Sequence, residues 1–521
     1  MINPTLPLKP YPFNQLMLFP PDIRDLIPSN HLVRVVNSLL EKLDVSFLHE
    51  TYKGGGCSAY DPRMLLKILV YAYTQKIFTS RKIAKALKEN IHFMWLSGFQ
   101  SPDFRTINRF RKKHLGPTFE KIFANSVEFL GQKKLLNLNE YFVDGTKIEA
   151  DANRYSFCWK KATDKFHDSL QAKVSQLFQE IEALNRLENE HYGDSDLEEL
   201  GENRQEITAT EIDNQVKKLE KQLSNKTKKQ YSENDKVKSK ALKKLKSDFL
   251  PRARKYEHYK SLFNGRNNFS KTDPDATFMC MKEDHMLNRK LKPGYNLQIG
   301  TNNQFVINYS VHQNPGDTLT LIPHLNKLQE NLGRFPEKVI ADAGYGSEEN
   351  YTFLEAANTE AYVKFNLFQK QSKKAFKKEI FHPDNLKYDA KKDQLECPAG
   401  EMLSLVREKT RKTENGFLQK AAIYRTEKCG NCSFNLQCAK GREFREISIN
   451  HRLRAYKENA LNLLKSEEGI ALRKRRATEP ETVFGNIKHN MGFKRLRLRG
   501  MLGANVECGL ICMAHNMIKM A

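Results

Sequence analysis

Residues 141–150 read YFVDGTKIEA in one-letter code, and the fold is decided in this stretch. Aromatic and β-branched residues lead into an Asp-Gly pair, a pattern typical of a β-strand that runs into a turn. Asp144 is therefore expected at the end of a strand, with the chain turning just beyond it. The preceding residues read as helices, so this strand marks the beginning of a sheet.

Later residues supply the rest of that sheet. They read in chain order as a hairpin of two strands, a helix, a strand, a helix and a last strand, over residues 294–300 and 305–311, 319–332, 338–342, a segment beginning at 347, and 361–365. This alternation predicts a mixed α/β sheet flanked by helices.

Two aspartates follow apolar strands. Asp144 comes after the first strand and Asp342 after Val339-Ile340-Ala341, each with a glycine within two residues. Strands of an α/β sheet deliver such residues to its rim, where two carboxylates repel each other unless a cation lies between them. Carboxylate oxygens there suit Mg²⁺ or Mn²⁺. For either residue alone, an aspartate that caps its own turn is the commoner explanation.

A third acid is expected in the segment EPETVFGNIK of residues 479–488. Glu481, Phe484 and Lys488 recur at spacings of three and four, which places them on one side of a helix. A carboxylate and a lysine in this arrangement would serve phosphodiester chemistry. Glu479 is a rival for the third acid, and a glutamate that only stabilises the start of a helix is the plainer alternative.

The N-terminal region reads as short helices with basic faces. Helix starts are predicted at Asp61-Pro62, at Thr79-Ser80 and near Asp103. Short helices with tight turns and a basic last helix suit a helix-turn-helix on DNA, and an ordinary bundle with solvated lysines is the alternative. The side chains expected to face DNA are Arg105, Arg109, Arg111, Lys112 and Lys113.

Residues 156–265 interrupt the sheet. Apolar residues recur at alternating spacings of four and three from Leu170 to Leu184 and again from Ile212 to Leu223. Two such helices, joined by a turn near residues 191–194, predict an antiparallel coiled-coil hairpin.

Four of the nine cysteines gather in a loop-rich, basic stretch. They are Cys397, Cys429, Cys432 and Cys438. A Cys-x-x-Cys pair with two further cysteines fits a tetrahedral structural Zn²⁺ site, and reduced free thiols are the alternative.

Charge and hydropathy bound the class of protein. The 521 residues carry 86 Lys and Arg against 62 Asp and Glu, a formal net charge of +24. Such an excess points to a polyanionic partner such as nucleic acid, although it can also be a solubilising surface charge. We find no apolar run long enough for a membrane span and no signal-like N-terminus, so we expect a soluble, cytoplasmic protein.

The order of these motifs resembles the DDE transposases of bacterial insertion sequences. The chain has Asp-Gly-Thr-Lys from Asp144, Asp-Ala-Gly-Tyr-Gly-Ser from Asp342, and Glu-x-x-Phe-Gly-x-x-Lys from Glu481 to Lys488. It also has DPDA at 273–276 and PGYN at 293–296. The likeness extends from Tyr60-Asp61-Pro62 to Ala514-His515-Asn516.

The resemblance implies a ribonuclease H-like core in which Asp144, Asp342 and Glu481 hold two Mg²⁺ or Mn²⁺ ions and Lys488 assists. Such an enzyme binds the terminal inverted repeats of an insertion sequence in double-stranded DNA, cleaves there, and joins the freed 3′-hydroxyl to target DNA. A homodimer on DNA, associated with the bacterial nucleoid, is implied, since two ends must be paired. The alternatives are a catalytically inactive DNA-binding protein and a nuclease that does not join ends, each derived from a transposase.

One departure from the family pattern concerns an arginine ahead of the third acid. Position 477 is Ala, so the nearest arginine is Arg476, five residues before Glu481. DNA contacts are expected of Arg476 and of the basic run after Lys488, which comprises Lys494, Arg495, Arg497 and Arg499.

These assignments divide the chain into six segments. They are a helical DNA-binding module (1–140), the first core strand (141–155), the coiled-coil insertion (156–265), the continued core (266–384), a Cys-rich insertion (385–445) and C-terminal core helices with the third acid (446–521).

Overall fold

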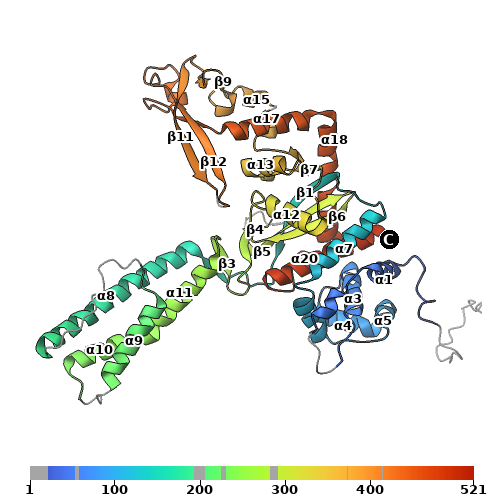
Figure 1. Cartoon of the computed structure of the whole chain (residues 1–521), viewed down its shortest axis with the longest axis horizontal. Helices are drawn as coiled ribbons and strands as arrows, with labels where there is room; N and C mark the ends of the chain where they lie inside the picture. Colours follow the sequence, from blue (N-terminus) through green and yellow to red (C-terminus); the bar gives the residue numbers. More distant parts are fainter. Residues whose placement is uncertain are drawn as a thin grey trace, which may run out of the picture. The chain divides into compact units, whose positions relative to one another are not determined.

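The computed structural model describes residues 22–52, 58–192, 206–224, 230–281, 291–371, 373–413 and 415–521 (Figure 1). The chain forms two compact units. The first comprises residues 1–136, 485–493 and 509–521, and the second comprises residues 137–484 and 494–508. No helix in the described ranges is long and apolar enough to cross a bilayer.

The first unit is helical, as the sequence predicts. Its helices begin where capping side chains are placed: Asp61 accepts the Met64 N–H at 2.9 Å and Asp103 accepts the Thr106 N–H at 2.7 Å. The helices are α1 (Leu32–Lys42), α2 (Phe47–Glu50), α3 (Pro62–Thr74), α4 (Ser80–Glu89), α5 (Ile91–Ser97), α6 (Phe104–Arg109), the π-helical η1 (Phe110–His114), α7 (Phe119–Gln132), the π-helical η6 (Asn486–Asn490) and the C-terminal part of α20 (Gly500–Met520).

The second unit is built on a mixed sheet, which confirms the expected α/β class. The strands lie in the order β4-β5-β1-β7-β8, with β6 also paired to β5. Pairs among β4, β5, β6 and β1 are antiparallel, whereas β7 and β8 run parallel to β1. The strands are β1 (Glu140–Glu149), β4 (Thr277–Cys280), β5 (Leu291–Asn302), β6 (Phe305–His312), β7 (Lys338–Ala341) and β8 (Glu360–Val363).

Strand β1 does not end at Asp144, and that expectation is wrong. It continues to Glu149 because β5 pairs with it from Phe142 through Glu149. The turn that Asp-Gly favours does not form. The paired residue opposite Gly145 is Gln298, whose side chain occupies the space that a Cβ at position 145 would need.

Helices cover both faces of this sheet (Figure 1). On one face, Phe142 and Ile340 pack with Leu464 and Leu472 of α17 and α18. On the other face, α12 brings His324 to Tyr141. These and the neighbouring helical segments are α12 (Leu321–Leu332), the 3₁₀ turn η4 (Ala343–Tyr345), α13 (Glu348–Ala356), α17 (His451–Lys465), α18 (Glu467–Arg476) and α19 (Pro480–Gly485).

The insertion after β1 is helical, but it has more helices than the predicted two-helix hairpin. Apolar residues of its helices share one core, including Leu170, Ile212 and Phe249. The predicted turn near 191–194 lies largely outside the described residues. The elements are β2 (Phe157–Trp159), α8 (Lys160–Tyr192), α9 (Ala209–Ser224), α10 (Glu233–Lys244), the π-helical η3 (Leu245–Phe249), α11 (Leu250–Phe263) and β3 (Asn268–Ser270).

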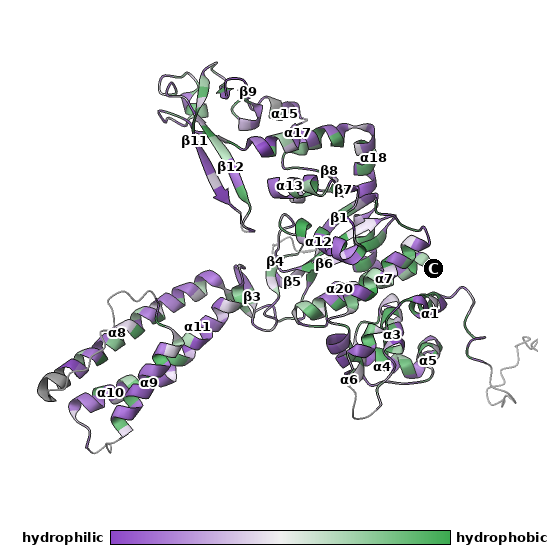
Figure 2. Ribbon diagram, in the orientation of Figure 1, coloured by the Kyte–Doolittle hydropathy of each residue, from purple (hydrophilic) through white to green (hydrophobic). Residues whose placement is uncertain are grey.

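The residues between β8 and α17 in the sequence form a second, antiparallel sheet. Its strand order is β13-β12-β11-β10-β9. Its core is small, and β11 is hydrophilic along most of its length (Figure 2). The elements of this region are α14 (Phe368–Gln371), α15 (Lys374–Lys377), η5 (Pro383–Asn385), β9 (Lys387–Asp389), β10 (Gln394–Glu396), β11 (Met402–Lys412), β12 (Leu418–Arg425), α16 (Asn435–Cys438) and β13 (Ile447–Ile449).

A chain of four polar side chains lies beneath the sheet, on the α12 face. The Tyr141 hydroxyl meets His324 Nε2 at 2.7 Å, and His324 Nδ1 and His312 Nε2 each meet the Ser310 hydroxyl at 2.7 Å. Burial, aided by the nearby Lys327 charge, lowers the pKa of His312 to about 4, while Asp317 opposes the shift. Burial likewise holds the pKa of His324 well below its usual value. Both imidazoles are therefore neutral at neutral pH.

We predict that the two buried histidines among these four side chains make the stability of the second unit sensitive to acid. Between about pH 6.5 and about pH 4 the unfolded chain binds protons that the folded imidazoles do not, so the free energy of unfolding falls as the pH falls. The slope is up to about 1.4 kcal/mol per pH unit for each histidine. Thermal melts of wild type and His312→Gln across this range test the prediction. The variant should lose stability less steeply, and equal slopes would contradict the assignment.

Candidate active site

The sheet brings Asp144 and Asp342 to adjacent positions. In the parallel pair of β1 and β7, Phe142 lies opposite Ile340. Two residues further along each strand stand Asp144 and Asp342, on the face that α17 and α18 cover. Strand β7 ends at Ala341, and the Asp342 carboxylate then accepts the Gly344 N–H at 2.9 Å. Asp342 is thus a strand-end residue as predicted, beside a mid-strand Asp144.

One arginine contacts all three predicted acids. Arg476 Nη2 lies 3.3 Å from an oxygen of Asp144 and 3.5 Å from an oxygen of Asp342, and its Nη1 lies 3.7 Å from Glu481. Arg476 and Asp144 are buried, whereas the Glu481 side chain is 57% exposed. The three carboxylates therefore converge on a single guanidinium, beside the point where β7 ends.

Arg476 and Glu481 lie on either side of the short turn that joins α18 to α19. Arg476 is the last residue of α18, and Pro480 begins α19 at the first position where proline suits a helix. Residues 477–479 form a turn between the two helices, and Arg476 Nη1 at the end of one lies 3.7 Å from Glu481 at the start of the next. The basic last turn of α18 also suits the negative end of its dipole.

Glu479, the rival for the third acid, has other partners. Its carboxylate accepts the Gln304 N–H at 2.7 Å in the turn between β5 and β6, and its other oxygen lies 3.6 Å from Arg475. The side chain is almost fully buried in that position. Of the two glutamates, only Glu481 has a contact with Arg476.

Lys364, at the end of β8, is a site residue that sequence reasoning missed. Its backbone N–H donates to the Ala341 carbonyl at 3.1 Å, directly before Asp342. Burial and the charges of Arg476 and Arg473 lower the pKa of Lys364, while Asp342 and Glu481 raise it. The residue is remote in sequence from both acids, and only the parallel pairing of β7 and β8 places it there.

The regular helical spacing expected between Glu481 and Lys488 is interrupted. The helix changes from α to π at Asn486, and a π-helical turn displaces the following side chains from the 3.6-residue spacing. Lys488 is buried and belongs to the first unit, whereas Glu481 is exposed and belongs to the second.

The donor set at the site fits a hard divalent cation in its chemistry. Asp144, Asp342 and Glu481 offer carboxylate oxygens, the ligands that Mg²⁺ and Mn²⁺ prefer. A cationic group, the Arg476 guanidinium, already lies where they converge. In the described part of the chain, no group of three or more His, Cys, Asp or Glu side chains is placed to hold a metal ion.

The four clustered cysteines line one small apolar pocket, so the sequence grouping is reproduced in space. Their sulfurs have protein partners: Arg445 Nη1 donates to Cys438 at 3.1 Å, and the Phe434 N–H donates to Cys432 at 3.4 Å. All described cysteines are free thiols. Among the described residues the cysteines do not form a group that could hold a metal ion, so the structure gives the zinc expectation no support.

The structure corrects one of the predicted DNA contacts in the first unit. Arg111 is 1% exposed, donates to the Tyr73 hydroxyl at 2.7 Å and to the Phe78 carbonyl at 3.1 Å, and so belongs to the core. The reason is that it lies in the π-helical η1, where the 3.6-residue periodicity fails. The other side chains predicted for this surface are exposed, namely Arg105, Arg109, Lys112 and Lys113.

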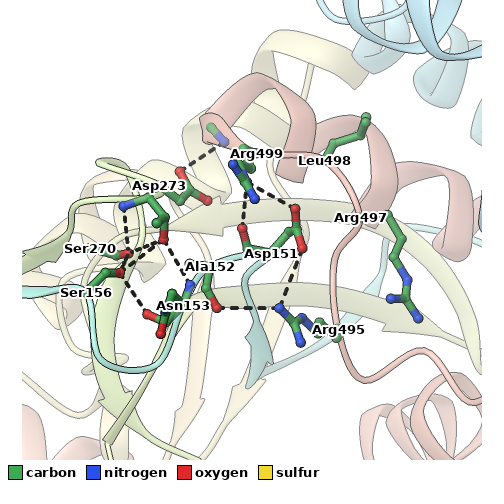
Figure 3. A network of polar contacts seen from close by, with 12 residues as sticks. Asp151, Ala152, Asn153, Ser156, Ser270, Asp273, Arg495, Arg497, Leu498 and Arg499 are labelled. Carbon is green, nitrogen blue, oxygen red and sulfur yellow. Dashed lines mark hydrogen bonds and ion pairs between the residues drawn. The ribbon is translucent and has the colours of Figure 1, made fainter. Parts of the chain in front are cut away.

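The basic run at 494–499 is anchored to the end of β1. Arg495 lies 3.5 Å and Arg499 3.1 Å from the Asp151 carboxylate, on which both converge (Figure 3). Asp151 therefore offsets part of the positive charge predicted to contact DNA. Arg497 is turned away from this network, and both Lys494 and Arg497 are exposed.

The DPDA motif caps helix α20. Asp273 accepts the Gly500 N–H at 3.1 Å, and Asp275 accepts the Met501 N–H at 2.8 Å. Asp273 also accepts the Tyr295 hydroxyl at 2.9 Å. Two carboxylates at the first backbone N–H groups satisfy donors that a helix leaves unpaired and suit the positive end of its dipole. The motif thus fixes the chain that follows the basic run.

Two comparisons with known families agree with this picture. Residues 396–521, which include Glu481, match the model of a transposase DDE domain. Residues 21–113, which include the basic helices α4 and α6, match the model of a transposase domain, DUF772. No curated protein matches the chain.

We predict that Arg476→Ala destabilises the second unit by about 3 kcal/mol, because it removes a cation that contacts the buried Asp144 carboxylate and the neighbouring Asp342 carboxylate. Lys474→Ala is the matched control, since Lys474 is exposed on the same helix and should change stability by less than about 0.5 kcal/mol. Thermal or urea unfolding in metal-free buffer measures both. Equal stability of the two variants would contradict the central role of Arg476.

Proposed function

The chain belongs to the DDE transposases, and from this premise we propose that it cleaves DNA at the ends of an insertion sequence and joins those ends to target DNA. The observation that carries the proposal is the convergence of Asp144, Asp342 and Glu481 on Arg476. The three acids come from separate segments, in the chain order that the family resemblance implies.

The sheet supports assignment of a ribonuclease H-like core. Antiparallel strands β6, β5 and β1 are followed by β7 and β8, which run parallel to β1. The first acid lies on the central strand and the second at the end of its parallel neighbour. The third acid comes from a helix that follows those packed on the same face.

We assign Asp144, Asp342 and Glu481 as the ligands of Mg²⁺ or Mn²⁺, with Glu479 in a structural role. When bound, the metal supplies Lewis-acid stabilisation of charge on phosphate oxygens. The protein contributes three carboxylates near the end of β7, together with two basic side chains, Arg476 and Lys364. A guanidinium presents forked N–H donors that match phosphate oxygens, so we assign Arg476 to the DNA backbone.

DNA binding is assigned to two basic surfaces. One consists of the exposed Arg105, Arg109, Lys112 and Lys113 of the first unit, and the other consists of Lys494 and Arg497 of the second. Contacts of this kind neutralise phosphates and release counterions, so binding should weaken as salt rises. Two ends must be held together for joining, and we therefore infer a homodimer on DNA, acting at the bacterial nucleoid.

We predict that Asp144→Asn, Asp342→Asn and Glu481→Gln each reduce Mg²⁺-dependent cleavage of cognate end DNA by at least about 10³-fold, equivalent to about 4 kcal/mol of transition-state stabilisation. Binding of the same DNA should persist. Glu479→Gln is the matched control and should retain cleavage, since the Glu479 carboxylate contacts the Gln304 N–H and Arg475 and not Arg476. Radiolabelled end fragments resolved on denaturing gels provide the measurement.

Two outcomes would favour the alternative functions, and a third would change the assignment of the third acid. Wild-type protein that binds ends without cleaving them would be a DNA-binding derivative, and protein that cleaves but cannot join pre-cut 3′-hydroxyl ends would be a nuclease. Loss of cleavage in Glu479→Gln with activity kept in Glu481→Gln would exchange the third acid.

A second prediction concerns the basic helices. Arg109→Ala and Lys113→Ala should weaken DNA binding and each reduce its salt slope by about one, while leaving stability unchanged. Arg111→Ala should instead lower stability, because it removes the buried hydrogen bonds that Arg111 donates to the Tyr73 hydroxyl and the Phe78 carbonyl. Salt-dependent binding isotherms and thermal melts of the three variants test this division. A salt-slope change in Arg111→Ala without loss of stability would overturn it.

A further inference from the structure

A fourth carboxylate lies behind the two aspartates of the site. Asp317 stands in the loop between β6 and α12, and neither the family motifs nor the spacing of the sequence identifies it. We propose that Asp317 is a positioning residue that fixes the backbone beside Asp144 and Asp342, and so sets the affinity of the site for divalent metal. This inference rests on the function proposed above.

The carboxylate has two side-chain donors from β5. Asn296 Nδ2 donates to Asp317 Oδ1 at 2.8 Å, and Gln298 Nε2 donates to the same oxygen at 2.9 Å. The two amides are also joined, since Gln298 Nε2 lies 3.0 Å from Asn296 Oδ1. Asn296 and Gln298 are buried, so these bonds form away from bulk water, where an unmade partner is costly.

Asp317 lies beside two glycines that closely follow Asp144 and Asp342, and the missing side chain at Gly145 leaves room for it. A Cβ on Gly145 would overlap the Gln298 amide and lie 2.7 Å from Asp317 Oδ1. A Cβ on Gly344 would lie 3.8 Å from Asp317 Oδ2 and 3.1 Å from Asp342 Oδ1. Gly145 follows Asp144, and Gly344 follows Asp342 by two residues. Asp317 therefore lies against the backbone next to each acid.

The loop between β6 and α12 also forms hydrogen bonds with the segment that follows Asp342. The Thr318 hydroxyl donates to the Gly344 carbonyl at 2.8 Å, and Asn350 Nδ2 donates to the carbonyls of Thr318 and Tyr345 at 2.9 Å and 2.8 Å. The Tyr345 hydroxyl donates to Gln298, which returns the chain of bonds to Asp317. Burial raises the pKa of Tyr345, as do the charges of Asp317, Asp144 and Asp342.

Geometry favours positioning over direct ligation. Side chains alternate along a strand, so position 145 faces away from the side on which Asp144 meets Arg476. Asp317 contacts that opposite side, and its Oδ1 accepts two amide bonds there. It acts through Gly145 and Gly344 rather than at the reacting phosphate. Groups that orient metal ligands typically change metal affinity by 10- to 100-fold when removed.

The test uses the full chain with Mn²⁺ as the probe. Free Mn²⁺ is measured by electron paramagnetic resonance during titration of wild type, Asp317→Ala, Asp317→Asn and the loop control Asn314→Ala. Asp317→Ala should raise the Kd for Mn²⁺ by about tenfold or more. Asp317→Asn should change it less, because an amide oxygen can still accept from Asn296 and Gln298. The Asn314 side chain is exposed, and its variant should match wild type.

Cleavage assays and melts complete the design. Asp317→Ala should regain DNA cleavage when Mn²⁺ is raised in proportion to its Kd, and Asp317→Asn should keep the wild-type melting temperature. An unchanged Kd in Asp317→Ala, with wild type binding Mn²⁺ normally, overturns the inference alone. An equal loss in Asp317→Asn and Asp317→Ala also overturns it, by making Asp317 a ligand. Wild type that binds no Mn²⁺ overturns the proposed function and this inference together.

Discussion

The contact of Arg476 with three carboxylates is the constraint on which the site depends. Asp144 and Asp342 stand on neighbouring parallel strands, so their negative charges cannot move apart and must be offset by a cation. The hydrophobic packing of Leu472 against Phe142 and Ile340 holds α18 so that its last residue reaches this point. Packing energy from an apolar face thereby maintains a charge arrangement that would be unfavourable on its own.

Local chemistry explains which parts of the fold the sequence could predict. Caps such as Asp61 and Asp103 act within one helical turn, and the mixed sheet follows from runs of apolar strands. The meeting of Asp144 and Asp342 also follows from the parallel pairing of two adjacent strands, in which Phe142 lies opposite Ile340. The end of β1 could not be predicted, because a partner strand more than 140 residues away pairs through the Asp-Gly signal.

The sequence could not predict the site residues that are far from the three acids in sequence and are brought to them by the fold. Lys364 reaches the site only through the pairing of β7 with β8, and Asp317 only through two buried amides of β5. Neither has a local motif. Asp317 leaves one trace in the sequence, which is indirect: a Cβ at position 145 would overlap the Gln298 side chain and come too close to Asp317, so glycine is required there.

Two π-helical turns interrupt helical segments that carry predicted functional residues. The segments around Arg111 and Lys488 each contain such a turn, which displaces the side chains that follow from the 3.6-residue spacing. For Arg111 that spacing predicts an exposed face, whereas the side chain is buried. Burial of a charged side chain is unfavourable unless it is paired, and Arg111 is paired through Tyr73 and Phe78. The π-helical turn therefore accounts for a side chain that is predicted to contact DNA and instead packs in the core of the first unit.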